Sequence, residues 1–366
     1  MTTKKIALDS YHRNLKARMV PFAGYDMPVS YKGIIEEHKA VRSGVGIFDV
    51  SHMGIVTLRG AGALSFADKM FTKPASKVAL GRGAYALLCN EKGQPLDDLI
   101  FYRTGEAELV VALNASNKES DLAWLQKHAP SDVEFDSRFE THSLFAIQGA
   151  RASDFLKILG VELNFDQLYG SGIFEVGGIK AQYFVSGYTG EKGCEVSVPN
   201  EFAEKLFDFF LKVETSLKDE SGAPLAVQPC GLGCRDTLRL EMGYSLYGHE
   251  LSLDINPIEA GLSWAIDLNS NFLGRDALAL YKEKPLRKMI ALQNKESRQA
   301  PRAEMKVLDS TGTECGFITS GTFSPSLGYV VGLAVVGTSS QAPYSVDMRG
   351  NKVIFETTKR PFYKKG

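Results

Sequence analysis

Apolar residues recur at helical spacing in several segments of the first 220 residues. The segments KGIIEEHKAVRSG (32–44), GALSFADKMF (62–71), SNKESDLAWLQKHAP (116–130) and PNEFAEKLFDFFLKV (199–213) predict helices, with Ser116 or Asn117 and Asn200 as caps. Shorter strand-like runs lie between them, including GIVTLRG (54–60), LIFYRTG (99–105), SLFAIQG (143–149) and CEVSVP (194–199). Because helices and strands alternate irregularly and are joined by turns of hairpin length, the pattern favours an α+β fold over a doubly wound parallel sheet.

The pattern changes from about Lys288 onward. Short strand-like runs follow one another at a spacing of about ten residues, with turn sequences such as DSTG and RGN between them. This regular spacing predicts a small all-β barrel or sandwich at the C-terminus. The charged connector YKEKPLRK (281–288), which contains a proline, is the expected boundary.

Composition narrows the possible functions. The chain has 366 residues, of which 44% are hydrophobic and 23% charged, as in an ordinary soluble globular protein. The net charge of -1 lacks the basic excess of a nucleic-acid binder. No signal peptide and no apolar run of the ~20 residues needed to cross a membrane is present, so we expect no membrane partner. Five scattered cysteines resemble free thiols of a reducing compartment, the cytoplasm, or the mitochondrial matrix if the source is eukaryotic.

Several catalytic motifs are missing from the sequence. It contains no P-loop, no G-x-G-x-x-G after a strand and no G-x-S-x-G elbow, which argues against nucleotide, nicotinamide or flavin binding and against a serine nucleophile. Cys230 and Cys234 are spaced C-x3-C, but no second Cys/His pair follows, so we expect no metal. His52, between two apolar runs, fits a hydrogen-bonded structural histidine better than a catalytic one.

Three polar stretches remain as candidates for binding or catalysis. In SGYTGEKGCE (186–195), the glycines favour a turn, although glycine also lets a backbone approach a ligand closely. Arg235 and Arg239 are i,i+4 neighbours on a predicted helix, as in a solvated ion-paired helix or an anion site. In PLDDLIFY (95–102), Asp97 and Asp98 point to opposite faces of a strand, and because both faces are apolar, periodicity does not say which one has a functional role.

Taken together, these stretches resemble one family. ARMVPFAGYDMPVSY, IEEHKAVRSGVGIFDVSHMG, LDDLIFY, GYTGEKGCE, GLGCRDTLRLEMGYSLYG, NPIEAGLSWAI, FLGRDAL and ITSGTFSPSLG occur in the order and at the separations found in the aminomethyltransferases (T-proteins) of the glycine cleavage system. The resemblance covers residues 15–363. It implies an α+β fold, a three-domain cloverleaf around a central folate cavity. The domains expected are 1–53 with 138–280, 54–137, which carries Asp98, and 281–366, the C-terminal all-β barrel.

The resemblance also implies a reaction. Members transfer the one-carbon unit from the aminomethyl-lipoyl arm of the H-protein to tetrahydrofolate, giving 5,10-methylenetetrahydrofolate, ammonia and dihydrolipoyl H-protein. The expected partners are the lipoylated H-protein and tetrahydrofolate, with or without a polyglutamate tail. No metal, nicotinamide or flavin is expected.

Roles carried over from the family fall on particular residues. Asp98 matches the catalytic aspartate, and Asp97 is then its structural neighbour. The residues expected to contact folate are Tyr188, Glu195, Arg235, Asn114, Asn117, Trp264, Tyr363, Met53 and Tyr85. The chain departs from the common pattern at Tyr25, Cys194 and Cys234 and in its N-terminal segment, where the fit to the H-protein is the feature most affected.

Two other functions deserve comparison. A folate-dependent demethylase of the same superfamily, in its flavin-linked form, would carry a dinucleotide-binding domain, and this chain has neither the length nor the glycine motif. A folate-binding regulatory or assembly protein would be expected to lack Asp98 or the GLGxRDTLRLE helix, and both are present.

Overall fold

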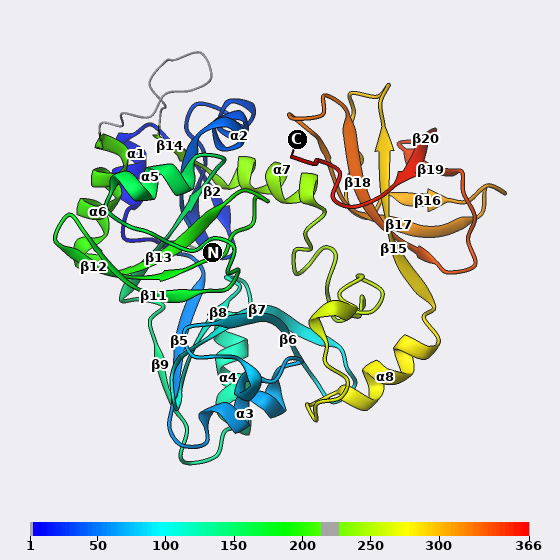
Figure 1. The fold of residues 1–366 in the computed structure, drawn as a ribbon. Helices are drawn as coiled ribbons and strands as arrows, with labels where there is room; N and C mark the ends of the chain where they lie inside the picture. Colours follow the sequence, from blue (N-terminus) through cyan, green and yellow to red (C-terminus); the bar gives the residue numbers. More distant parts are fainter. Residues whose placement is uncertain (1–2, 214–226, 366) are drawn as a thin grey trace. The chain divides into compact units, whose positions relative to one another are not determined.

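The structure is a computed structural model that describes residues 3–213 and 227–365 (Figure 1). The chain forms two compact units. The first comprises residues 1–67, 75–85 and 99–236, and the second comprises residues 68–74, 86–98 and 237–366. The three-domain division expected from the family is finer than this one and stays a prediction.

A six-stranded sheet forms the centre of the first unit. Its strands follow the order β11 (Ser171–Val176), β12 (Ile179–Phe184), β13 (Gly193–Pro199), β10 (His142–Gln148), β4 (Val45–Asp49) and β14 (Val227–Cys230). Neighbouring strands are antiparallel except β14, which is parallel to β4. The helices of this region are α1 (Asp9–Asn14), α2 (Ile34–Ser43), α5 (Ala152–Ile158) and α6 (Asn200–Lys212).

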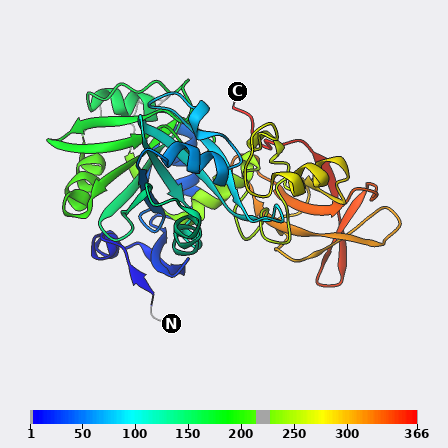
Figure 2. The same ribbon diagram turned by 90° about the horizontal axis from the view of Figure 1, so that it is seen from below.

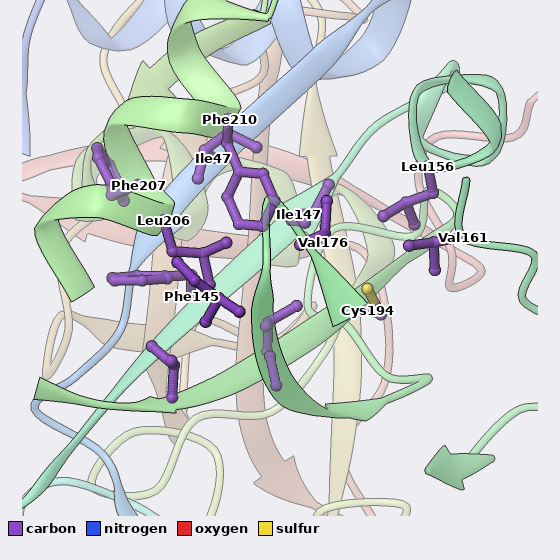
Figure 3. Packing of buried hydrophobic residues seen from close by; sticks show 14 of the residues in the cluster. Ile47, Phe145, Ile147, Leu156, Val161, Val176, Cys194, Leu206, Phe207 and Phe210 are labelled. Atoms are coloured by element: carbon purple, nitrogen blue, oxygen red, sulfur yellow. The ribbon is translucent and has the colours of Figure 1, made fainter. Parts of the chain in front are cut away.

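The core of this unit lies between the sheet and helix α6. Leu206 and Phe210 lie on the buried face that the spacing in PNEFAEKLFDFFLKV predicts, and Phe207 is buried beside them. The three side chains pack on Phe145 and Ile147 of β10 (Figure 3). Phe202, which the spacing also places on this face, is 39% exposed. Removing one of these buried side chains would cost about 3 kcal/mol of unfolding free energy. The core therefore holds the ends of β10 and β13, from which candidate site residues project.

A five-stranded sheet has the order β6 (Gly83–Cys89), β7 (Pro95–Gly105), β8 (Glu108–Leu113), β5 (Gly54–Arg59) and β9 (Glu134–Ser137). The segments that connect these strands contain helices α3 (Ala63–Met70) and α4 (Lys118–His128) and the 3-10 turn η1 (Ala75–Lys77). A small N-terminal sheet has the order β1 (Lys4–Lys5), β3 (Tyr25–Ser30), β2 (Arg18–Phe22).

The second unit contains a closed barrel. Its strands are β15 (Arg287–Asn294), β18 (Val330–Gly337), β17 (Glu314–Phe323), β16 (Lys306–Leu308), β19 (Tyr344–Met348) and β20 (Asn351–Thr358), and β15 pairs with both β18 and β20 (Figure 2, orange to red). The barrel interior is filled by apolar side chains that include Leu292, Ile318 and Val346. The elements α7 (Leu232–Met242), η2 (Ser263–Ala265) and α8 (Arg275–Glu283) precede the barrel in sequence.

The predicted α+β class and the C-terminal barrel are confirmed, and the predicted helices all form. The expected cap at Asn200 is wrong. Asn200 is the first residue of α6, and its side chain accepts a hydrogen bond from Ser143 and donates one to the carbonyl of Glu140 instead. Asn117 precedes α4 but makes no capping bond. No helix within the described ranges is long and apolar enough to span a membrane.

Candidate functional site

The loop between β12 and β13 presents a buried carboxylate. Glu195, on β13, is only 6% exposed, and its Oε2 accepts a hydrogen bond of 2.9 Å from Ser186 Oγ at the start of the loop. In this loop Gly190 has a φ of +77°, which an L-residue rarely adopts, so the turn predicted for SGYTGEKGCE is present. Because a carboxylate has about four acceptor positions, one bond from Ser186 leaves Glu195 capacity for a ligand.

Arg235 faces this carboxylate from the first turn of α7. At the start of this helix Gly231 and Gly233 let the chain pass close to the backbone of Val29, where a Cβ would lie under 3 Å away. Arg235 Nη2 lies 3.6 Å from Glu195 Oε1, longer than the ~2.8 Å of a charge-assisted hydrogen bond. The two groups are therefore paired electrostatically without consuming each other's hydrogen-bonding capacity.

The guanidinium of Arg235 lies against aromatic rings. Its Cζ is 5.2 Å from the ring centroid of Tyr188 and 6.0 Å from that of Phe48, within the range of cation–π attraction. Its Nη1 is buried, and within residues 3–213 and 227–365 it has no hydrogen-bond partner. A buried N–H without an acceptor is costly. This arrangement fits a ligand that supplies an acceptor.

Tyr102 of β7 adds a second unpaired polar atom. Its ring packs on Phe184, with centroids 4.6 Å apart, and its buried hydroxyl meets hydrogen-bond geometry with no group in the described part of the chain. Burial raises the pKa of Tyr102 well above its usual value, and the nearby Glu195 carboxylate adds to the rise, while Ser186 partly offsets it. The hydroxyl is thus a neutral donor and acceptor close to Glu195.

His52 is buried near Arg235. Burial, together with the charges of Arg235 and Lys118, lowers the pKa of His52 to about 3, so the ring is neutral at physiological pH. Its Nδ1 has no hydrogen-bond partner among the residues that the structure describes. The expected hydrogen bond is therefore missing at Nδ1, and the ring packs against Phe22 in a T-shaped arrangement with centroids 5.5 Å apart.

The segment after β8 lies beside His52. Lys118 is fully buried, and its Nζ donates hydrogen bonds of 2.8 Å to the hydroxyl of Tyr25 and to the carbonyl of His52. Burial lowers the pKa of Lys118 to about 8. In the β5–β8 ladder Gly54 pairs with Leu113, so the next residues outward, Met53 and Asn114, are neighbours. Asn117 follows in the same turn, where its N–H bonds the Asn114 carbonyl.

The two aspartates of β7 differ in burial. Asp97 is fully buried and lies on the same face as Leu99 and Phe101, whereas Asp98 is partly exposed. Asp98 shares its face with Tyr102, because alternate residues of a strand point the same way. The tertiary structure thus distinguishes two residues between which periodicity could not choose.

The remaining predicted residues lie on several elements. Tyr85 follows Gly83 by two positions on β6, and a Cβ on Gly83 would lie 2.7 Å from the Tyr102 ring, so Tyr85 is on the Tyr102 side. Trp264, in η2, is 57% exposed. Tyr363 lies in a C-terminal segment where its N–H bonds the Glu241 carbonyl. The first unit thus brings Tyr188, Glu195 and Arg235 together directly. Four more predicted residues lie on other elements of this unit: Met53, Tyr85, Asn114 and Asn117. Asp98, Trp264 and Tyr363 belong to the second unit.

Arg239, the helical neighbour of Arg235, has a structural environment. It is buried, and its Nη1 lies 2.8 Å from Glu250 and also donates to the Tyr244 carbonyl. The alternative of a solvated ion-paired helix is therefore wrong for this arginine. Glu250 supplies the counter-charge that a buried guanidinium requires.

Three buried groups have the composition of a metal site. Ligand atoms of Glu37, Cys230 and Cys234 lie within 4.8 Å of one another. However, Glu37 Oε1 already accepts hydrogen bonds from the amides of residues 31–33, and Oε2 accepts one from Gly231. Burial raises the pKa of the Cys234 thiol, which favours its protonated form. The carboxylate therefore joins the end of β3 to the entry of α7.

Comparisons with known proteins agree with the geometry. The family model described as "GCVT N-terminal domain" matches residues 8–270, and "Glycine cleavage T-protein C-terminal barrel domain" matches residues 287–364. The chain is 39% identical to an aminomethyltransferase of Flavobacterium psychrophilum, covering 99% of this chain and all of the relative, and 40% identical to one of Chlorobium phaeobacteroides, covering 99% of each. It is also similar to the crystal structure of glycine cleavage system aminomethyltransferase T from Bartonella henselae, with a TM-score of 0.88, 31% identity and 98% of each chain covered.

Proposed function

The chain belongs to the glycine cleavage T-protein family of aminomethyltransferases, and we propose that the Glu195–Arg235 pair of its first unit binds the pterin ring of tetrahydrofolate. The chain is a tetrahydrofolate-dependent aminomethyltransferase. It transfers the one-carbon unit from the aminomethyl-lipoyl arm of the H-protein to tetrahydrofolate, giving 5,10-methylenetetrahydrofolate, ammonia and dihydrolipoyl H-protein. The proposal concerns which residues perform this reaction.

The observation that carries the proposal is the incomplete hydrogen bonding of this pair. A pterin edge offers adjacent N–H donors and a carbonyl acceptor. Glu195 can accept the donors, and the buried, unpartnered Nη1 of Arg235 can donate to the acceptor. The ring of Tyr188 beside the guanidinium offers a flat surface for a planar ligand. The residues present therefore fit the group.

Asp98 is proposed as the catalytic carboxylate. Tetrahydrofolate, when bound, supplies the amine nitrogens that accept the one-carbon unit. Asp98 would orient the attacking amine and stabilise the positive charge that develops at the transferred carbon. Its partial exposure and its position on the same face of β7 as Tyr102 support this role over that of Asp97. Preorganised electrostatic stabilisation of this kind is worth about 3 kcal/mol per group.

Further residues are proposed to contact the folate. In the first unit these are Met53, Tyr85, Asn114 and Asn117. Trp264 and Tyr363, in the second unit, are proposed as folate contacts on the strength of the family resemblance. The reaction as proposed uses no metal, nicotinamide or flavin, and its partners are the lipoylated H-protein and tetrahydrofolate, with or without a polyglutamate tail. All five cysteines are free thiols, and this supports the proposal that the protein acts in the cytoplasm.

A binding measurement tests the pterin site. Glu195→Gln keeps the shape of the side chain but removes the charge and one acceptor, and it should raise the folate dissociation constant about 30-fold, or ~2 kcal/mol. Glu175→Gln, an exposed position in the same sheet, is the matched control and should bind folate normally. Folate binding unchanged in Glu195→Gln would remove this residue from the site.

A further inference from the structure

The loop that carries Tyr188 and ends at Glu195 is held by one buried side chain. Gln148, the last residue of β10, is fully buried. Its Nε2 donates to the carbonyl of Ser186 at 3.0 Å and to that of Ile147 at 3.2 Å. Its Oε1 accepts a hydrogen bond of 2.9 Å from Thr189 Oγ1. The amide thus bonds the loop on both sides of Tyr188.

Two glycines of the loop make room for this amide. A Cβ on Gly187 would lie 2.0 Å from Gln148 Oε1, and a Cβ on Gly193 would lie 2.3 Å from Gln148 Nε2. Neither glycine has a positive φ, so the turn conformation does not require glycine at these positions. Gly187 and Gly193 are therefore needed because the backbone passes directly against the side chain of Gln148.

The contacts continue from Gln148 to the carboxylate. Ser186, whose carbonyl is held by Gln148, donates its Oγ to Glu195 Oε2. Main-chain pairing also ties the strands, because Gln148 is opposite Gly193 in the β10–β13 ladder and Ala146 is opposite Glu195. A shift of the amide would therefore move Ser186 and, through Oε2, the carboxylate of Glu195, whose other oxygen, Oε1, faces Arg235.

A buried ion pair holds the tip of the same loop. Arg42 Nη1 donates to the carbonyl of Thr189 and lies 3.0 Å from Glu191 Oε1, and both side chains are almost fully buried. The N–H of Glu191 bonds Thr189 Oγ1, the hydroxyl that donates to Gln148. Thr189 therefore links the ion pair to the amide, and the loop is fixed before any ligand arrives.

From this network we infer that Gln148 is a positioning residue for folate affinity. It does not touch the ligand; it holds the Tyr188 ring and the Glu195 carboxylate in the geometry that receives the pterin. A fixed loop loses little conformational freedom on binding, and this preorganisation strengthens affinity. The inference rests on the proposed pterin site and adds to it a residue that the family motifs did not indicate.

The test uses isosteric variants of the full chain. Gln148→Met keeps the volume and removes all three hydrogen bonds, and Gln148→Glu replaces the donor with an acceptor that faces two carbonyls. Each should raise the KM for tetrahydrofolate about tenfold or more, as expected for the loss of buried hydrogen bonds, with the KM for H-protein unchanged. Thr189→Val is a milder variant, which should raise the folate KM about threefold.

Matched variants separate positioning from general destabilisation. Thr189→Ser keeps the hydroxyl and should restore the wild-type folate KM. Gln182→Met removes another glutamine of the same sheet, one that bonds Arg138 rather than the loop, and should leave the folate KM unchanged.

Two outcomes would overturn the inference. One is a wild-type folate KM in folded Gln148→Met and Thr189→Val. The other is an equal rise of the KM values for folate and H-protein in these variants. Glu195→Gln, assayed in parallel, separates this result from failure of the pterin site. If Gln148 variants bind folate normally while Glu195→Gln does not, only the positioning role fails. If Glu195→Gln also binds normally, the site itself is wrong.

Discussion

Acidification should destabilise the protein through His52. The ring is only 5% exposed, and burial lowers the pKa of His52 to about 3, against about 6.5 in an unfolded chain. Above pH 6.5 the ring is neutral in both states and contributes no pH dependence. Below pH 6.5 His52 becomes protonated in the unfolded chain, whereas in the folded protein it stays neutral down to about pH 3. The free energy of unfolding therefore falls as pH falls through this window.

The size of the effect follows from linkage. Each pH unit below 6.5 costs about 1.4 kcal/mol, so the loss at pH 5 is about 2 kcal/mol relative to pH 7.5. Because the ring is almost fully buried, solvent screening does not reduce this value much. The loss is a large fraction of the ~10 kcal/mol that stabilises a typical domain.

The loss of unfolding free energy on acidification is measured by urea unfolding at pH 7.5, 6.5, 5.5 and 5.0, at constant ionic strength. The expected result is that His52→Gln loses about 2 kcal/mol less than wild type between pH 7.5 and 5.0. Other titrating groups are common to both proteins and cancel in the difference. His128→Gln, a half-buried position on α4 that leaves His52 in place, should keep the wild-type slope. A His52→Gln slope equal to that of wild type would refute a buried neutral ring at this position.

Further predictions concern the reaction and the folate. Asp98→Asn should fold and bind folate but lose about 100-fold or more in turnover, and near-normal turnover would exclude the catalytic role. Asp97→Asn, at a buried position, should lower the unfolding temperature and leave turnover near wild type. Tyr102→Phe removes a buried hydroxyl that meets hydrogen-bond geometry with no group in the described ranges, so unfolding stability should stay near wild type while the folate dissociation constant increases about threefold. A large loss of stability with unchanged affinity would contradict this. Trp264→Phe should abolish most of the fluorescence quenching by folate, and Trp124→Phe should leave it. Prolonged treatment with a chelator, followed by assay in metal-free buffer, should leave turnover unchanged, and restoration of a lost activity by Zn²⁺ would contradict the metal-free proposal.

Local pattern was sufficient for the elements themselves. The helix over α6 and the strands of the C-terminal barrel follow from periodicity, because the apolar face of an element must be buried wherever it packs. The same rule placed Asp97 and Asp98 on opposite faces of one strand. The family followed from short motifs in a fixed order, and these also indicated Tyr188, Glu195 and Arg235 as neighbours.

The hydrogen-bond partners of individual side chains could not be predicted from the sequence. Asn200 looked like a helix cap, but its side chain accepts a hydrogen bond from Ser143, on a strand 57 positions earlier. His52 looked like a hydrogen-bonded structural histidine, but its Nδ1 has no hydrogen-bond partner in the described chain, and burial with the charges of Arg235 and Lys118 lowers the pKa of the ring.

The tertiary structure decided burial and register. Both faces of PLDDLIFY are apolar, so only packing could show that Asp97 is enclosed and Asp98 accessible. No motif indicated Gln148, since a glutamine at the end of a strand is ordinary. Its proposed role depends on the strand pairing that sets Gly193 opposite it and on the close packing of the Gly187 backbone against its side chain. Sequence patterns report which face of an element is apolar, a property of neighbours in the chain. Which polar atoms meet depends on contacts between residues that are distant along it, and those exist only once the sheets have formed.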